Sequence, residues 1–150
     1  MNEATTRKNL IDVQLAEAGW DINDASQVSL EFDIKVDLPT GVSEAQTPYQ
    51  GHQFSDYTLH GKDGKVLAVV EAKRSSVDAE LGKEQAKQYC YNIQKEKCGE
   101  LPFCFYTNGY EIYFWDLGNY PPKKVIGFPS REDLNRYQYI RRNRRPLATE

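Results

Sequence analysis

A short apolar run that ends in an acid-x-lysine triplet constrains the fold of this chain most strongly. Val66–Val70 leads directly into Glu71–Lys73, and the preceding dipeptide Asp63–Gly64 is a strong signal for a two-residue hairpin turn. With that dipeptide as the turn centre, Asp56 precedes the turn by as many residues as Glu71 follows it. The spacing predicts two antiparallel strands on which Asp56 and Glu71 are directly opposed.

These side chains would share one face of the sheet with Lys73, which lies two residues beyond Glu71 on the same strand. Opposed carboxylates destabilise a sheet unless something compensates, and Mg²⁺ prefers such oxygen ligands together with water and phosphate oxygens. A metal there can activate a water at a phosphoryl group, and the Lys73 ammonium can orient that water or offset phosphate charge. The alternative is a solvated charge cluster on a surface hairpin. The apolar strand argues against it because that strand is predicted to be buried.

Hydrophobic periodicity predicts an alternation of helices and strands along the chain. Helices are predicted over residues 5–18, 75–97 and from Ser130 onward, and strands over 28–36, 54–60, 65–73, 102–107, 110–116 and near Val125, with a long loop over 37–53. Asn108–Gly109 predicts the second hairpin, and Ser130-x-x-Asp133 resembles a capping box. Both alternating sets of the 102–116 hairpin are apolar, which predicts a sheet covered on both faces. The order predicts an α/β fold, a central mixed β-sheet flanked by helices.

Composition bounds the class of protein. A chain of 150 residues suits one domain, and its net charge of −3 neither indicates nor excludes nucleic-acid binding. No apolar run is long enough to span a membrane, and the first residues lack the apolar stretch of a signal peptide. The three cysteines lack CxxC spacing, the two histidines complete no zinc pattern, and this usage favours a reducing cytoplasm. The late arginines are interpreted as a solvated helix face and basic linker, or as a contact for phosphate or an acidic neighbouring domain. They are Arg131, Arg136, Arg141, Arg142, Arg144 and Arg145.

Asp56 followed by Glu71–Lys73 resembles the PD-(D/E)XK nuclease motif, with Ser55 where a proline usually precedes the aspartate. Gln85 and Tyr89 lie on one face of a predicted helix and resemble the Q-x-x-x-Y motif of RecB-type nucleases and type I restriction subunits. Nearly the whole chain is similar to the N-terminal region of the restriction (R) subunit of type I restriction–modification enzymes. The similar segments are 3–7, 18–20, 71–74, 85–89 and 107–109.

The resemblance implies a restriction-endonuclease-like core and roles for six residues. Asp56 and Glu71 would bind Mg²⁺, or Mn²⁺ as a substitute, with the backbone carbonyl of Ala72. Lys73 would position the attacking water or stabilise phosphate charge. Gln85 and Tyr89 would contact the DNA backbone or hold the active-site strand. For these two, the alternative is a polar pair at a helix–sheet seam, where the tyrosine packs and its hydroxyl finds a partner.

The resemblance also implies an organisation. Residues 1–145 would form the endonuclease-like domain, and 146–150 would begin a linker to a motor region outside this chain. ATP would act only in that region, since the phosphate-loop pattern GxxxxGK[ST] does not occur here. The partners would be double-stranded DNA and the methylation and specificity subunits, and the domain would cut without its own sequence readout. The alternatives are a non-catalytic nuclease-fold module that binds DNA or protein, and a stand-alone repair or junction nuclease.

Overall fold

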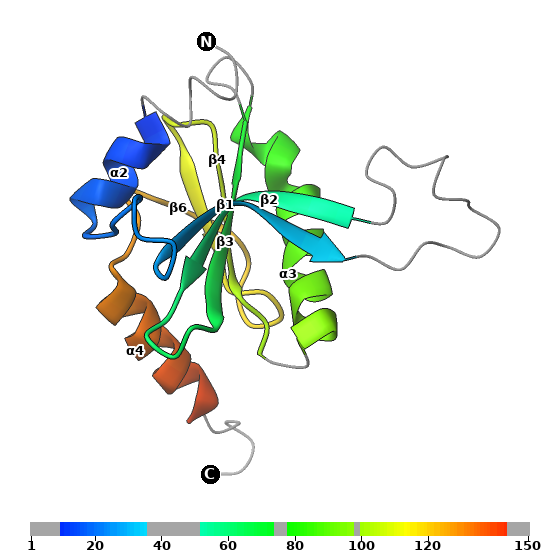
Figure 1. Cartoon of the computed structure of the whole chain (residues 1–150). Coiled ribbons are helices and arrows are strands. Elements are labelled where there is room, and N and C mark those ends of the chain that lie inside the picture. The colour runs from blue at the N-terminus through cyan, green and yellow to red at the C-terminus, as the bar shows by residue number, and fades with distance from the viewer. Residues whose placement is uncertain (1–9, 36–51, 74–77, 98–99, 144–150) are drawn as a thin grey trace, which may run out of the picture.

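A six-stranded mixed β-sheet organises the chain in the computed structural model shown in Figure 1. The structure describes residues 10–35, 52–73, 78–97 and 100–143. The strands lie in the order β1-β2-β3-β4-β5-β6, so each strand pairs with its neighbours in sequence. Four of the pairings are antiparallel, and only β3 and β4 run parallel. The predicted central mixed sheet flanked by helices is confirmed.

The elements follow the predicted order with shifted ends. The strands are β1 Val28–Lys35, β2 His52–His60, β3 Val66–Ala72, β4 Phe103–Thr107, β5 Ile112–Trp115 and β6 Lys123–Val125, and the helices are α2 Asp12–Glu17, the short 3₁₀ helix η3 Ala79–Gly82, α3 Lys83–Lys97 and α4 Arg131–Arg142. The predicted 37–53 loop and 146–150 linker lie outside the described residues, except that 52 and 53 belong to β2. Over the described ranges, none of the helices is long and apolar enough to cross a bilayer.

Helices cover the sheet on both faces, as Figure 1 shows: α3 packs on one face, and α2 and α4 pack on the other. The alternation along β3 explains this arrangement, because Ala68 and Val70 join the core under α2 and α4, whereas Val69 joins the core under α3. All three side chains are fully buried. The prediction that the sheet is covered on both faces is therefore confirmed, with α4 as an additional cover.

The β2–β3 hairpin keeps the predicted register through a turn that differs from the predicted one. Tyr57 pairs with Val70, as a centre at Asp63–Gly64 requires, but His60 pairs with Val66, so a bulge shifts the ladder by one residue. The loop spans residues 61–65 rather than two residues. The prediction of a two-residue turn is wrong, but the bulge compensates for the longer loop. The pairing next to Asp56 is the same in both cases.

The helix α3 forms the crossover between the parallel strands β3 and β4. Ala86, Cys90 and Ile93 form its buried stripe against the sheet. Leu81, which helical spacing assigns to the same stripe, belongs to η3 instead, and 68% of its surface is exposed. The 3₁₀ turn therefore brings the start of α3 close to the end of β3 before the regular helix begins.

Candidate functional site

The end of β3 brings together the three predicted charged residues. Because Tyr57 pairs with Val70, Asp56 lies across from Glu71 at the next position of the register. The backbone N–H of Ala72 donates to Asp56 Oδ2 at 2.7 Å. The Nζ atom of Lys73 lies 3.7 Å from Glu71 Oε1. The structure thus places both carboxylates and the ammonium at one end of the β2–β3 pair.

Burial differs among these groups. The side chain of Glu71 is 5% exposed and that of Lys73 is 21% exposed, whereas Asp56 is half-buried. Burying a carboxylate costs free energy unless an opposite charge or hydrogen bonds compensate, and the Lys73 ammonium supplies such a charge here. The Glu71 carboxylate is therefore buried, and the Lys73 ammonium beside it is more exposed to solvent.

The donor set suits Mg²⁺. In a strand, the N–H and C=O of one residue point to the same edge, so the Ala72 carbonyl lies on the side where its N–H meets Asp56. Mg²⁺ commonly binds through one or two carboxylates and keeps several waters, a demand that two carboxylates and one carbonyl meet. No cluster of three or more His, Cys, Asp or Glu side chains that could hold a metal occurs among the described residues. The set therefore fits a hydrated hard cation and not an all-protein cage.

The helix α3 holds the ammonium of Lys73 through the predicted Gln–Tyr pair. Lys73 Nζ donates to Gln85 Oε1 at 3.1 Å, and Gln85 Nε2 donates to the Tyr89 hydroxyl at 2.6 Å. Gln85 and Tyr89 lie one turn apart on α3 and therefore share a face. The phenol of Tyr89 is buried, with 2% of the residue exposed, and Gln85 is half-buried. Two consecutive hydrogen bonds therefore connect buried Tyr89 to Lys73 through Gln85.

Gly82 is a site residue that the sequence reasoning missed. A Cβ atom added at this position would lie 3.2 Å from Glu71 Cγ and 3.6 Å from Lys73 Cε. Such a contact with Glu71 would be tighter than ordinary van der Waals contact. The junction between η3 and α3 can therefore approach the end of β3 this closely because residue 82 has no side chain. A glycine inside a predicted helix was the available signal, since glycine there often marks a close approach or an end.

Tyr106 borders the site on the β4 side. It pairs with Glu71 in the parallel register, and its ring stacks on Tyr113 with centroids 4.9 Å apart. Burial, and then the negative charge of Glu80, raise the pKa of the Tyr106 phenol well above its ordinary value. The phenol therefore stays neutral and serves as a packed wall.

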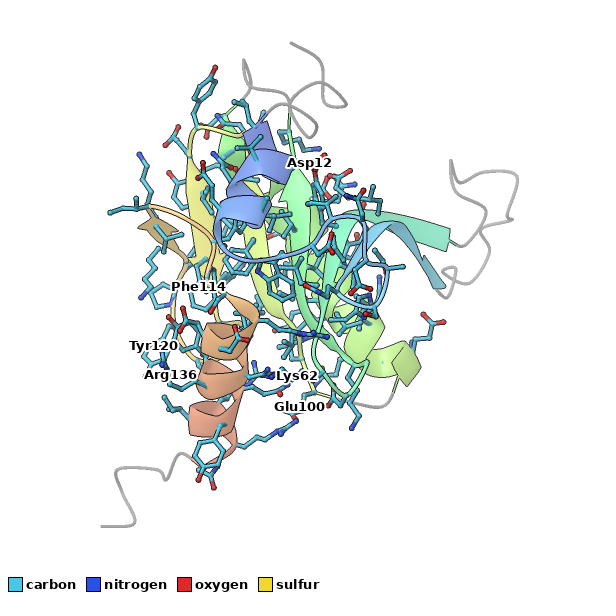
Figure 2. The ribbon with its side chains drawn as sticks, turned by 60° about the vertical axis from the view of Figure 1, so that its left-hand side comes forward. Asp12, Lys62, Glu100, Phe114, Tyr120 and Arg136 are labelled. Carbon is cyan, nitrogen blue, oxygen red and sulfur yellow. The ribbon has the colours of Figure 1, made fainter. Side chains whose placement is uncertain are left out.

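A cavity of about 620 Å³ lies on the other face of the sheet, between α4 and the strands β4–β6. Figure 2 shows Phe114 and Tyr120, two of its lining residues, beside α4. Its lining is largely apolar and includes none of Asp56, Glu71 and Lys73. This cavity is therefore separate from the charged cluster.

Comparisons with known proteins agree on one family. A sequence profile described as "Type I restriction enzyme R protein N terminus" matches residues 42–123. A solved fragment provisionally assigned as the HsdR subunit of a type I restriction enzyme from Vibrio vulnificus YJ016 superposes with a TM-score of 0.69 and 26% sequence identity. The match covers 92% of this chain and 25% of the other, so this chain spans about a quarter of its length. No curated protein sequence matches significantly.

Proposed function

We propose, since the chain belongs to the family of type I restriction enzyme R protein N termini, that it is the Mg²⁺-dependent endonuclease domain of such a subunit. Its substrate would be the phosphodiester backbone of double-stranded DNA. The observation that carries the proposal is the convergence of Asp56, Glu71 and Lys73 at the end of β3, with Lys73 held by Gln85.

Each residue has a proposed role. Asp56, Glu71 and the Ala72 carbonyl would hold Mg²⁺, and the bound ion would supply activation of a water and stabilisation of phosphate charge. Lys73 would orient the attacking water or offset the charge that develops on the phosphate, because its ammonium is fixed beside Glu71. The half-buried Asp56 would present its carboxylate from the solvent side of the pair.

The geometry favours a positioning role for Gln85 and Tyr89 over a direct DNA contact. Tyr89 is almost fully buried, and its hydroxyl already accepts a hydrogen bond from Gln85. The carbonyl oxygen of Gln85 faces Lys73. Together the two residues would restrict the lysine to one orientation, and preorganised charge is most effective when it need not reorient during the reaction.

The remaining functions of the enzyme would lie outside this chain. The solved relative is about four times as long, so an ATP-driven motor and the contacts to methylation and specificity subunits have room elsewhere in such a subunit. Recognition of a base sequence would also lie elsewhere, because contacts to the sugar–phosphate backbone carry no direct sequence information.

Substitutions at the proposed centre test this function in the complete restriction complex. Glu71→Gln, which removes the buried negative charge, and Lys73→Ala are each expected to lower the DNA cleavage rate by roughly 10²-fold or more. Glu84→Gln and Lys62→Ala are matched controls, because both side chains are exposed and neither residue belongs to the proposed centre. Cleavage at the wild-type rate by folded Glu71→Gln and Lys73→Ala complexes would refute the catalytic role.

A further inference from the structure

We propose that Lys83 and Lys87, in the first turns of α3, form a binding tract for DNA phosphates on the β5 side of the site. The inference rests on the proposed function and extends it, because these two lysines lie outside the set assigned to catalysis. The tract would bind the backbone through charge and read no bases.

Both lysines are held over one aromatic ring. Lys83 Nζ lies 5.1 Å from the centroid of the Trp115 ring, and Lys87 Nζ lies 5.8 Å from the same centroid. The lysines are one helical turn apart and therefore share a face of α3. Attraction to an aromatic ring orients an ammonium group without neutralising it. The Trp115 ring thus holds the Lys83 and Lys87 ammonium groups close to each other.

No carboxylate compensates these two charges within the described ranges. The lysines around the site differ in this respect: Lys124 forms an ion pair with Glu111 at 3.0 Å, and Lys73 is paired with Glu71. For Lys83 and Lys87, the contacts with Trp115 are the interactions found among the described residues. Two like charges over one ring repel each other, and an anion between them would offset this repulsion.

The tract adjoins the catalytic cluster. Lys83 directly follows Gly82, whose backbone lies against Glu71 and Lys73. On the sheet, the Trp115 ring meets the Tyr106 ring edge-on, with centroids 6.4 Å apart, and Tyr106 is the register partner of Glu71. A nucleic-acid backbone that reaches the cluster can therefore extend along α3 over Trp115. This continuity favours DNA phosphate over an acidic protein surface as the partner.

Salt-dependent DNA binding tests the tract. The full 150-residue chain is titrated with a short DNA duplex in EDTA, so that no cleavage occurs, at several salt concentrations. Each lost phosphate contact is expected to reduce the slope of log K against log salt by roughly 0.9. Lys83→Gln and Lys87→Gln should each show this reduction, whereas Lys83→Arg should retain the slope. Lys95→Gln is the matched control, because Lys95 is an exposed lysine farther along the same helix.

An unchanged slope in both glutamine variants, an equal change in Lys95→Gln, or no measurable duplex binding by the wild-type chain would each overturn the tract. Urea unfolding of every variant checks that the fold is retained. The two proposals fail separately. Loss of cleavage in Glu71→Gln with unchanged salt slopes would remove only the tract. A reduced slope together with normal cleavage by Glu71→Gln would remove only the catalytic assignment.

Discussion

Lys73 is the residue whose environment says most about the site, because three different parts of the chain fix it. Glu71 near the end of β3 lies 3.7 Å from its ammonium, and Gln85 on α3 accepts its hydrogen bond. The backbone at Gly82 lies against its aliphatic stem. A lysine held in this way keeps its charge at one place, whereas a lysine on an open surface samples many rotamers.

Gly82→Ala tests the close approach of η3 to the strand end. The added methyl group would lie 3.2 Å from Glu71 Cγ, so the glutamate must shift by a few tenths of an ångström. Replacing glycine in a helical turn also stabilises the chain by roughly 0.5–1 kcal/mol, which offsets part of the contact. We expect Mg²⁺ affinity, measured by calorimetry, to fall roughly tenfold or more, as for other changes that disturb supporting contacts.

Gly127→Ala is the matched control for this prediction, because a Cβ atom there meets nothing within 4 Å. The free energy of unfolding of Gly82→Ala should stay within about 1 kcal/mol of the wild type. Equal Mg²⁺ affinities for Gly82→Ala, Gly127→Ala and the wild type would show that the contact does not position the carboxylate.

Spacing in the sequence indicated the charged residues and the Gln–Tyr pair, but not their surroundings. Asp56 and Glu71 follow from the hairpin count, and Gln85 and Tyr89 from helical spacing and a family resemblance. Gly82 and the tract over Trp115 depend instead on how closely α3 approaches the sheet. That approach is a property of tertiary packing, which local periodicity does not encode.

At the scale of elements, the β2–β3 hairpin shows why a register can be predicted when a turn cannot. A register slip of one residue would turn Glu71 toward the apolar core under α2 and α4, so the cost of burying a carboxylate there fixes the pairing. The turn carries no such constraint. Gly64 has a positive φ of 81°, as a tight turn requires, but the loop takes five residues and the bulge at Leu59–His60 absorbs the difference.

The N-terminus of α4 offers a test of an element that the sequence signalled well. Ser130 Oγ accepts a hydrogen bond from the Asp133 N–H at 3.1 Å, which confirms the Ser130 half of the predicted capping box, whereas Asp133 Oδ1 pairs with Arg136 at 2.7 Å. Ser130→Ala is expected to lower the free energy of unfolding by about 1 kcal/mol, and Ser130→Asp to retain most of it, because an aspartate can cap equally well. Urea denaturation measures both. Wild-type stability in Ser130→Ala would mean that the cap contributes nothing.

In the whole molecule, α4 contacts the turn end of the β2–β3 hairpin as well as the sheet. The Arg131 guanidinium donates to the backbone oxygens of His60 and Gly61 at 3.0 and 2.8 Å. At the other end of α4, Arg141 lies 3.5 Å from both Glu100 and Asp116. Arg131 and Arg141 therefore make contacts within the domain. The alternative that the late arginines contact an external partner applies to the others.

The environment of His60 makes the free energy of unfolding depend on pH. Burial, together with the nearby Arg131 charge, lowers the pKa of His60 below its ordinary value, although a hydrogen bond from the His60 ring to the Gly64 backbone carbonyl opposes the shift. As the pH falls, the unfolded chain therefore takes up the proton before the folded chain does. The contribution of His60 to stability should be fully present above about pH 7 and decline as the pH drops through about 6.5. Below the folded pKa it should level off.

Urea unfolding at a series of pH values checks this expectation. His60→Gln should flatten the decline, because the titrating group is gone while the amide can still reach Ser29, which lies 2.9 Å from His60 Nε2. His52→Gln, which removes the other of the two histidines, serves as the matched control. An identical pH dependence in His60→Gln and the wild type would contradict the assignment to His60.

The carboxylates of Asp56 and Glu71 are proposed to form a cation site. The most direct measurement is a crystal of the chain soaked in Mn²⁺ and examined for anomalous scattering. We predict a peak between the two carboxylates at coordination distances of roughly 2.0–2.3 Å, with Lys73 still bound to Gln85. The Glu71→Gln variant, soaked in the same way, should lose the peak. Carboxylates that stay empty at Mn²⁺ concentrations well above those that support cleavage would contradict the account.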